Sequence, residues 1–184
     1  MLATPAQSVP TGPEWQYEVK HDGYRMIARA ENDKARIWSR WGLPWTASFP
    51  SIIGSLRDLG RSVVIDGEAL CQFEDGHSDF HALASYDGCA KAVLWAFDLL
   101  MLDGEDIRAL PLEVRRKRLL ELLEDTTPEW IMYSEHQEGD GEALYRAACK
   151  AGLEGIVAKR KGSRYASGRS KAWVKVKNPT FTRR

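Results

Sequence analysis

The early part of the chain alternates between strand-like runs and turn dipeptides, and this pattern most constrains the fold. Residues 15–21 alternate polar and apolar side chains, and Asp22-Gly23 follows as a turn signal. Residues 24–31 form a second such run, Asn32-Asp33 a second turn, and residues 35–39 a third run. Because period-two alternation between turn dipeptides is typical of paired strands, we expect an antiparallel meander here.

Helical signals follow. Apolar residues recur at helical spacing between Phe49 and Leu59, and Gly60 comes next as a stop signal. Pro111 opens a charged amphipathic helix, and Asp140 can cap a helix over residues 141–151. Further strands are expected at residues 62–73 and 92–100 and in two later runs near the C-terminal end. We therefore predict an α+β fold of antiparallel sheets flanked by helices, with an irregular lead-in at residues 1–13 and a single domain at residues 14–184.

The charge of the chain is unevenly distributed. The 184 residues are 43% hydrophobic and carry no formal net charge, which suits one globular domain with a real core. Residues 155–184 hold ten Lys or Arg and no Asp or Glu, so the remainder carries 16 basic and 26 acidic residues, a net of −10. This asymmetry indicates a surface for phosphates, although a solvated basic end is the simpler alternative.

Cysteine usage and the N-terminal segment indicate the compartment. Cys71, Cys89 and Cys149 are widely spaced, and we interpret them as free thiols in a reducing compartment. The N-terminus has no signal-peptide pattern, and no run is apolar enough to span a membrane, so we expect a cytoplasmic protein. His77 and His81 lack a third partner at helical spacing, and we do not expect them to bind a metal.

The run from Glu18 to Arg25 reads Glu-Val-Lys-His-Asp-Gly-Tyr-Arg and presents Lys20 as a candidate nucleophile. On a strand, Glu18, Lys20 and Asp22 would share one face. Two carboxylates favour an ammonium, which is not nucleophilic, so the site would need nearby cations or desolvation to release the amine. The simpler alternative is a solvated charge beside an ordinary hairpin.

Four later motifs favour the catalytic interpretation. They are Asp66-Gly67-Glu68, Phe97-Asp98-Leu99-Leu100, residues 154–159 (Glu-Gly-Ile-Val-Ala-Lys) and residues 173–177 (Trp-Val-Lys-Val-Lys). Taken singly, each has an ordinary interpretation as a turn, a core aromatic or a surface charge. Their order, together with the Lys20 motif, resembles the nucleotidyltransferase motifs of ATP-dependent DNA ligases. The resemblance runs from about Glu14 to Lys177 and is greatest for the ligase domain of bacterial non-homologous end-joining proteins.

The resemblance implies a nucleotidyltransferase (ATP-grasp-like) fold and a covalent mechanism. Lys20 would attack the α-phosphate of ATP, form lysyl-AMP and pass the AMP to a DNA 5′-phosphate, so that a nick is sealed in DNA repair. The implied nucleotide-binding residues are Glu18 at the adenine edge, Arg25 at the ribose, Phe97 stacked on adenine, Glu68 at the ribose or a metal, and Lys175 and Lys177 at the α-phosphate. Glu154, with Glu68, would bind Mg²⁺, and Asp22 would support Lys20.

DNA contacts are implied for Arg40, Lys159, Arg164 and Arg169, with nicked or broken double-stranded DNA as the partner. Arg40 lies in Ser39-Arg40-Trp41-Gly42, where the resemblance implies that it binds the nucleotide as well as the DNA 5′-phosphate. Trp41 stands where the family commonly has Asn. Residues 160–171 interleave basic residues, glycines and a tyrosine, which suits contacts with a sugar-phosphate backbone.

Ligases of this family normally continue into an oligonucleotide-binding (OB) fold domain, for which we find no sequence after residue 184. We therefore expect a monomer with weak adenylation and sealing, helped by a separate OB-fold domain or a repair protein. Two alternatives stay open. One is a ligase-like module that holds DNA ends or a partner with little turnover, and the other is an RNA ligase or capping-type nucleotidyltransferase.

Overall fold

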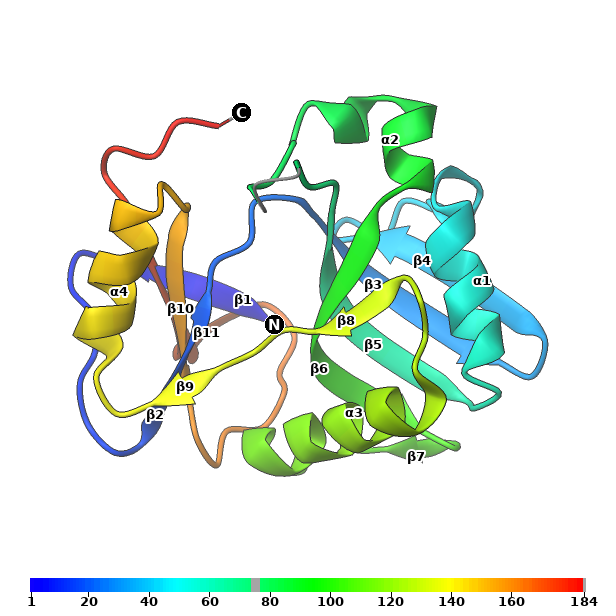
Figure 1. Cartoon of the computed structure of the whole chain (residues 1–184). Helices are drawn as coiled ribbons and strands as arrows, with labels where there is room; N and C mark the ends of the chain where they lie inside the picture. Colours follow the sequence, from blue (N-terminus) through cyan, green and yellow to red (C-terminus); the bar gives the residue numbers. More distant parts are fainter. Residues whose placement is uncertain (74–76, 184) are drawn as a thin grey trace. The chain divides into compact units, whose positions relative to one another are not determined.

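A computed structural model describes residues 1–73 and 77–183. The chain divides into two compact units (Figure 1). Unit 1 comprises Met1–His21, Ala109–Glu113 and Glu135–Arg183, and unit 2 comprises Asp22–Arg108 and Val114–Ser134. The boundary between His21 and Asp22 falls inside the Lys20 motif, so the motif contributes residues to both units.

Unit 1 is built on a five-stranded sheet in the order β1-β11-β10-β2-β9. Its strands are β1 (Leu2–Ala6), β2 (Trp15–Val19), β9 (Gln137–Glu138), β10 (Gly155–Arg160) and β11 (Arg169–Lys177). Helix α4 (Gly141–Lys150) packs on one face, where Tyr17, Ile156 and Val176 are at most 1% exposed. Asp140 caps α4 by accepting a hydrogen bond from the Ala143 N–H, as expected. The opposite face is left for polar side chains.

Unit 2 is built on a six-stranded sheet in which β4-β3-β5-β6-β7 are consecutive and β8 pairs with β6. Its strands are β3 (Tyr24–Glu31), β4 (Lys34–Ser39), β5 (Val63–Leu70), β6 (Val93–Leu102), β7 (Glu105–Asp106) and β8 (Ile131–Tyr133). The helices are α1 (Pro50–Asp58), α2 (Tyr86–Ala90) and α3 (Leu112–Thr126), of which α3 begins in unit 1. Met26 and Ile65 from the sheet and Ile52 from α1 are fully buried in the core.

The α+β class is confirmed, with corrections to the topology. Both sheets are mixed, because β1 runs parallel to β11 and β8 parallel to β6. The expected meander is wrong: β3 and β4 do form a hairpin, but β2 pairs with β10 and β9 in the other sheet. The lead-in over residues 1–13 is not irregular throughout, because Leu2–Ala6 pairs with β11. That pairing is set by a partner more than 160 residues away, which local patterning does not reveal.

None of the helices in the described residues combines the length and the apolar character that a membrane crossing requires.

Candidate functional site

Lys20 lies immediately after β2, at the end of the unit 1 sheet. Its backbone N–H donates to the Gly155 carbonyl at 2.9 Å, which anchors it beside the start of β10. Its side chain is 20% exposed, and the ammonium forms an ion pair with Glu154 and a 3.5 Å hydrogen bond to the His21 carbonyl. The strand β2 ends at Val19, one residue before Lys20. The carboxylate beside Lys20 is one that is distant in sequence.

Glu154 is a buried carboxylate that joins two lysines. It is 4% exposed, and besides Lys20 it pairs with the Lys177 ammonium at 2.8 Å. Burial by itself would raise the pKa of Glu154, but the positive charges and hydrogen bonds of Lys20 and Lys177 outweigh this and lower the pKa below its usual value. Unit 1 therefore places two ammonium groups on one ionised carboxylate, an arrangement that suits a phosphate group.

Gly155 explains how Glu154 comes so close to β11. Its φ of +134° disfavours any side chain, and an added Cβ would lie 2.1 Å from the Val176 carbonyl oxygen. The Glu154 carbonyl in turn accepts a hydrogen bond from the Asn178 N–H at 2.9 Å. The glycine thus allows the two strands to approach at the level of Glu154 and Lys177.

A second, deeper ion pair lies on the same sheet. Glu18 and Lys159 are 3% and 2% exposed, and their charged atoms are 2.7 Å apart. The Lys159 ammonium also lies 4.2 Å from the centre of the Trp173 ring. An ammonium buried and paired in this way is not presented to a duplex, so Lys159 is better placed to hold Glu18 than to contact DNA.

Two further residues of unit 1 complete this polar face. Lys175 lies opposite Val157, whose other neighbour across the sheet is Glu18, so Lys175 and Glu18 share a row across three strands. Burial lowers the pKa of His21 to about 4, with the charges of Lys20 and Lys159 acting in the same direction and Glu18 opposing them. His21 is therefore neutral at pH 7.

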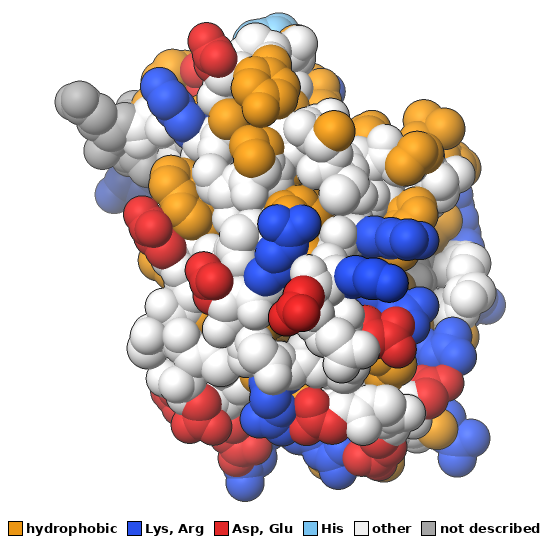
Figure 2. Space-filling model, turned by 90° about the vertical axis from the view of Figure 1, so that its right-hand side faces the viewer, with side chains coloured by type: hydrophobic (Ala, Val, Ile, Leu, Met, Phe, Trp, Pro, Cys, Tyr) orange, Lys and Arg blue, Asp and Glu red, His pale blue; other side chains and the backbone are white. Residues whose placement is uncertain are grey.

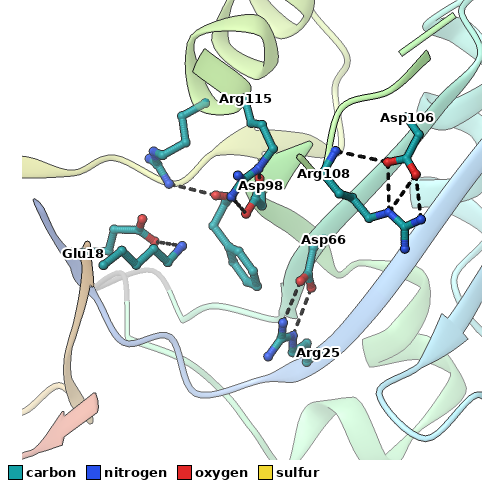
Figure 3. Close-up of polar contacts among 10 residues, drawn as sticks. Glu18, Arg25, Asp66, Asp98, Asp106, Arg108 and Arg115 are labelled. Carbon is teal, nitrogen blue, oxygen red and sulfur yellow. Dashed lines mark hydrogen bonds and ion pairs between the residues drawn. The ribbon is translucent and has the colours of Figure 1, made fainter. Parts of the chain in front are cut away.

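Unit 2 brings together the other expected nucleotide-binding residues. Arg25 lies directly across β3 and β5 from Glu68. Its guanidinium lies 5.4 Å from the centre of the Phe97 ring and forms bonds of 3.0 and 2.6 Å to Asp66 (Figure 3). Phe97 is 9% exposed, a burial that also suits a core residue. Asp66 is fully buried, so the carboxylate fixes the arginine in one orientation.

Asp22-Gly23 does not form the expected hairpin turn. Asp22 is 6% exposed, and an added Cβ on Gly23 would lie 2.2 Å from the Ala69 carbonyl oxygen. The glycine therefore serves a close approach to β5.

Two arginines on α3 are buried, although the sequence predicted only a charged amphipathic helix and did not single them out. Arg115 and Arg116 are at most 1% exposed. Arg115 forms a two-pronged pair with the buried Asp98, at 2.7 and 2.8 Å (Figure 3). Together with Leu112 and Leu119 they follow the spacing i, i+3, i+4, i+7, so helical periodicity was the signal that could have identified them.

The remaining candidates for DNA contact are exposed arginines. Arg40 follows β4 in unit 2, and its guanidinium lies 4.7 Å from the centre of the Trp41 ring, which is 77% exposed. Arg164 and Arg169 are exposed in unit 1, in and just after the loop between β10 and β11. The face shown in Figure 2 carries basic and acidic side chains interspersed. Candidate DNA contacts must therefore be argued from individual residues.

No group of three or more His, Cys, Asp or Glu side chains is placed to hold a metal within residues 1–73 and 77–183. A magnesium ion at Glu154 would thus take most of its ligands from phosphate oxygens and water, which is normal for Mg²⁺.

Comparison with known proteins decides the family. A family model described as "ATP dependent DNA ligase domain" matches residues 1–177. The chain belongs to the ATP-dependent DNA ligase domain family. This ligase domain is 41% identical over 180 residues, 96% of its length, to the multifunctional non-homologous end joining protein LigD of Pseudomonas aeruginosa.

Solved structures agree. The structure titled "mycobacterial DNA ligase D complexed with ATP and MES" superposes with a TM-score of 0.82 at 34% identity, covering 96% of this chain and 60% of that one. The ligase domain of Mycobacterium tuberculosis LigD gives a TM-score of 0.81 at 34% identity, with the same coverage. The DNA ligase adenylation-domain fold is therefore confirmed. The chain spans about a fifth of the Pseudomonas LigD protein, 21% of its length.

Proposed function

We propose that this ligase domain is an ATP-dependent adenylation enzyme that activates DNA 5′-phosphates for sealing. The observation that carries the proposal is the pairing of both Lys20 and Lys177 with the buried Glu154. A nucleophilic amine, a second cation and an ionised carboxylate are the groups that nucleotidyl transfer to lysine requires.

The proposed reaction has two stages on Lys20. The Lys20 ammonium first loses a proton to water, and its neutral Nζ attacks the α-phosphorus of ATP. A P–N bond forms, the bond to the leaving pyrophosphate breaks, and the nitrogen gives a second proton to water. A DNA 5′-phosphate oxygen then attacks the same phosphorus, and the P–N bond breaks as Nζ regains its protons. A 3′-hydroxyl attacks the adenylated 5′-phosphate, and AMP leaves. Lys175 and Lys177 would neutralise charge on the α-phosphate as it is attacked.

Other residues would bind the nucleotide. We assign Arg25 and Glu68 to the ribose, Phe97 to the adenine ring and Glu18 to the adenine edge, with Asp22 supporting Lys20. Glu154 and Glu68 are the carboxylates we assign to Mg²⁺, which would supply positive charge to the phosphate oxygens. Arg40, Arg164 and Arg169 are assigned to the DNA backbone, where such contacts position a duplex without reading its sequence.

The proposed setting is DNA repair in the bacterial cytoplasm. The substrate is nicked or broken double-stranded DNA, and an OB-fold domain or a repair protein is the proposed partner of a monomeric ligase domain. Nicked duplex, single-stranded DNA and nicked RNA offered to the adenylated protein would distinguish a DNA ligase from an RNA ligase.

The direct test is covalent labelling with α-labelled ATP and Mg²⁺. Wild type should take up label that survives denaturation, and Lys20→Ala should take up none. Lys150→Ala, in an exposed position on α4, is the matched control and should label as wild type does. Equal labelling of wild type and Lys20→Ala would refute the proposal.

A further inference from the structure

Phe97 occupies an irregular position in β6. The register between β5 and β6 passes from Asp66↔Asp98 to Gly67↔Ala96, so Phe97 is the extra residue of a β-bulge. Bulges locally bend a strand and re-aim a side chain, and they are common beside active sites. The direction of the Phe97 ring therefore depends on this bulge, and a neighbouring contact is needed to stabilise the bulge.

Arg116 on α3 makes the contact that can hold it. Its guanidinium donates to the Phe97 carbonyl at 2.9 Å and to the Ser134 carbonyl at 2.6 Å. It also lies 4.8 Å from the centre of the Tyr133 ring. The side chain therefore ties the bulge in β6 to the end of β8.

Burying this guanidinium is costly. Arg116 is 1% exposed, and the acceptors named above are neutral carbonyls. Removing a charge from water costs several kcal/mol unless hydrogen bonds and neighbouring groups offset it. A leucine would pack α3 against the sheet without that cost, so packing alone does not account for an arginine here. Its neighbour Arg115 forms an ion pair with Asp98. Two consecutive arginines of α3 therefore bind two consecutive residues at the bulge, Phe97 and Asp98.

We propose that Arg116 is a positioning residue for the nucleotide: it holds the bulge so that the Phe97 ring keeps one orientation for the purine. This rests on the proposed function, because it assumes that adenine meets Phe97. Arg116 itself touches no substrate in this proposal and acts through Phe97.

The test is a double-mutant cycle on Arg116→Met and Phe97→Leu. The rate of self-adenylation, measured over a series of ATP concentrations, separates the half-saturating ATP concentration from the maximal rate. In the wild-type background Arg116→Met should raise the half-saturating concentration about tenfold and leave the maximal rate within about threefold. In the Phe97→Leu background the same change should shift it less than about twofold, because the ring on which it acts is gone.

Controls separate positioning from stability. Arg118→Met, on the same helix with a 33% exposed side chain, should leave both kinetic quantities unchanged. If Arg116→Met does not fold, Arg116→Lys keeps the charge and a single donor nitrogen, and it should give a smaller shift that is again lost in the Phe97→Leu background. Equal shifts in the two backgrounds, or a loss of maximal rate alone, would overturn the inference.

Failure of the proposed adenylation activity would give different experimental results from failure of the role proposed for Arg116. A wild type that neither labels with ATP nor binds a non-hydrolysable ATP analogue overturns both proposals. A wild type that labels normally while the cycle is additive overturns only the role of Arg116.

Discussion

The two units carry different kinds of ion pair. In unit 1 the buried carboxylates are paired with lysines, Glu154 with Lys20 and Lys177 and Glu18 with Lys159. In unit 2 the buried pairs are made by arginines, with Arg25 on Asp66 and Arg115 on Asp98. The accessible lysines at Glu154 therefore differ from the fully buried Arg115–Asp98 pair both in side-chain type and in exposure.

The chemistry of the two side chains explains the difference. A lysine ammonium is a point charge on a flexible stem, can lose its proton and can become a nucleophile. An arginine guanidinium stays charged and grips a carboxylate with two parallel bonds. The Glu154 lysines are partly exposed, at 20% and 60%, so a phosphate can take them over from Glu154. The Arg115–Asp98 pair is fully buried and leaves no such room.

The largest effect is expected from breaking the deepest arginine pair. Arg115→Leu leaves the buried Asp98 carboxylate without the guanidinium, which should lower the free energy of unfolding by about 3–5 kcal/mol. Arg115→Lys keeps the charge but loses the two-pronged geometry, so it should cost less, roughly 1.5–3 kcal/mol. Urea unfolding at pH 7 measures both. If Arg115→Lys is as stable as wild type, the two parallel hydrogen bonds of the guanidinium do not contribute to the free energy of unfolding.

An effect of similar size, on the rate of self-adenylation rather than on stability, is expected from replacing Lys177 in unit 1. Lys177→Met removes one of the two cations proposed for the α-phosphate and should slow self-adenylation by about 10²–10³-fold. Because the side chain is 60% exposed, the free energy of unfolding should change by less than about 1 kcal/mol. Lys150→Met is the matched control. Equal labelling rates would remove Lys177 from the proposed site.

A smaller effect is expected from pH, through His21. The folded-state pKa of about 4 lies below the ordinary value of 6.5. Between these values the unfolded chain binds the proton and the folded protein does not. The stability that neutral His21 contributes is therefore complete above pH 6.5 and is lost as pH falls toward 4, by up to about 3 kcal/mol.

His21→Asn should flatten that part of the stability curve, measured by urea unfolding from pH 4.5 to 7.5. Glu154 affects mainly the acid end of this window, because its pKa is lowered from the ordinary value of 4.5 and its contribution is lost as pH falls below about that value. Identical curves for wild type and His21→Asn would contradict the assignment.

The smallest effect is expected from an arginine pair at the surface. Arg61 and Asp103 of unit 2 form an ion pair with side chains 41% and 48% exposed. Arg61→Ala should lower the free energy of unfolding by at most about 1 kcal/mol, and less at high salt. A loss as large as that of Arg115→Leu would mean that arginine identity, rather than burial, sets the contribution.

Local patterns predicted much of the fold. The Asn32-Asp33 hairpin, the helix ended by Gly60 and the Asp140 cap all form as expected, because each depends on residues close in sequence. The connection between β2 and β3 was misassigned, since Asp-Gly is a common hairpin signal and only long-range pairing places the strands in different sheets. The strand at Leu2–Ala6 was missed for the same reason.

The candidate site, like the fold, was predicted only in part from the sequence. The ordered motifs identified Lys20, Glu154 and Lys177, which the structure places together. They did not predict that Glu18 forms an ion pair with Lys159, or that Asp66 and Asp98 each form an ion pair with an arginine. Such pairings depend on which charges share a buried space, and a motif does not encode that.

The most direct test of the contrast between the units is the location of AMP in the protein. Wild type incubated with ATP and Mg²⁺ would be digested and analysed by mass spectrometry, alongside Lys20→Arg, which keeps the charge and lacks the nucleophilic amine. We expect AMP on the wild-type peptide that contains Lys20 and no AMP anywhere in a folded Lys20→Arg protein. AMP on another residue, or equal adenylation of the two proteins, would contradict it.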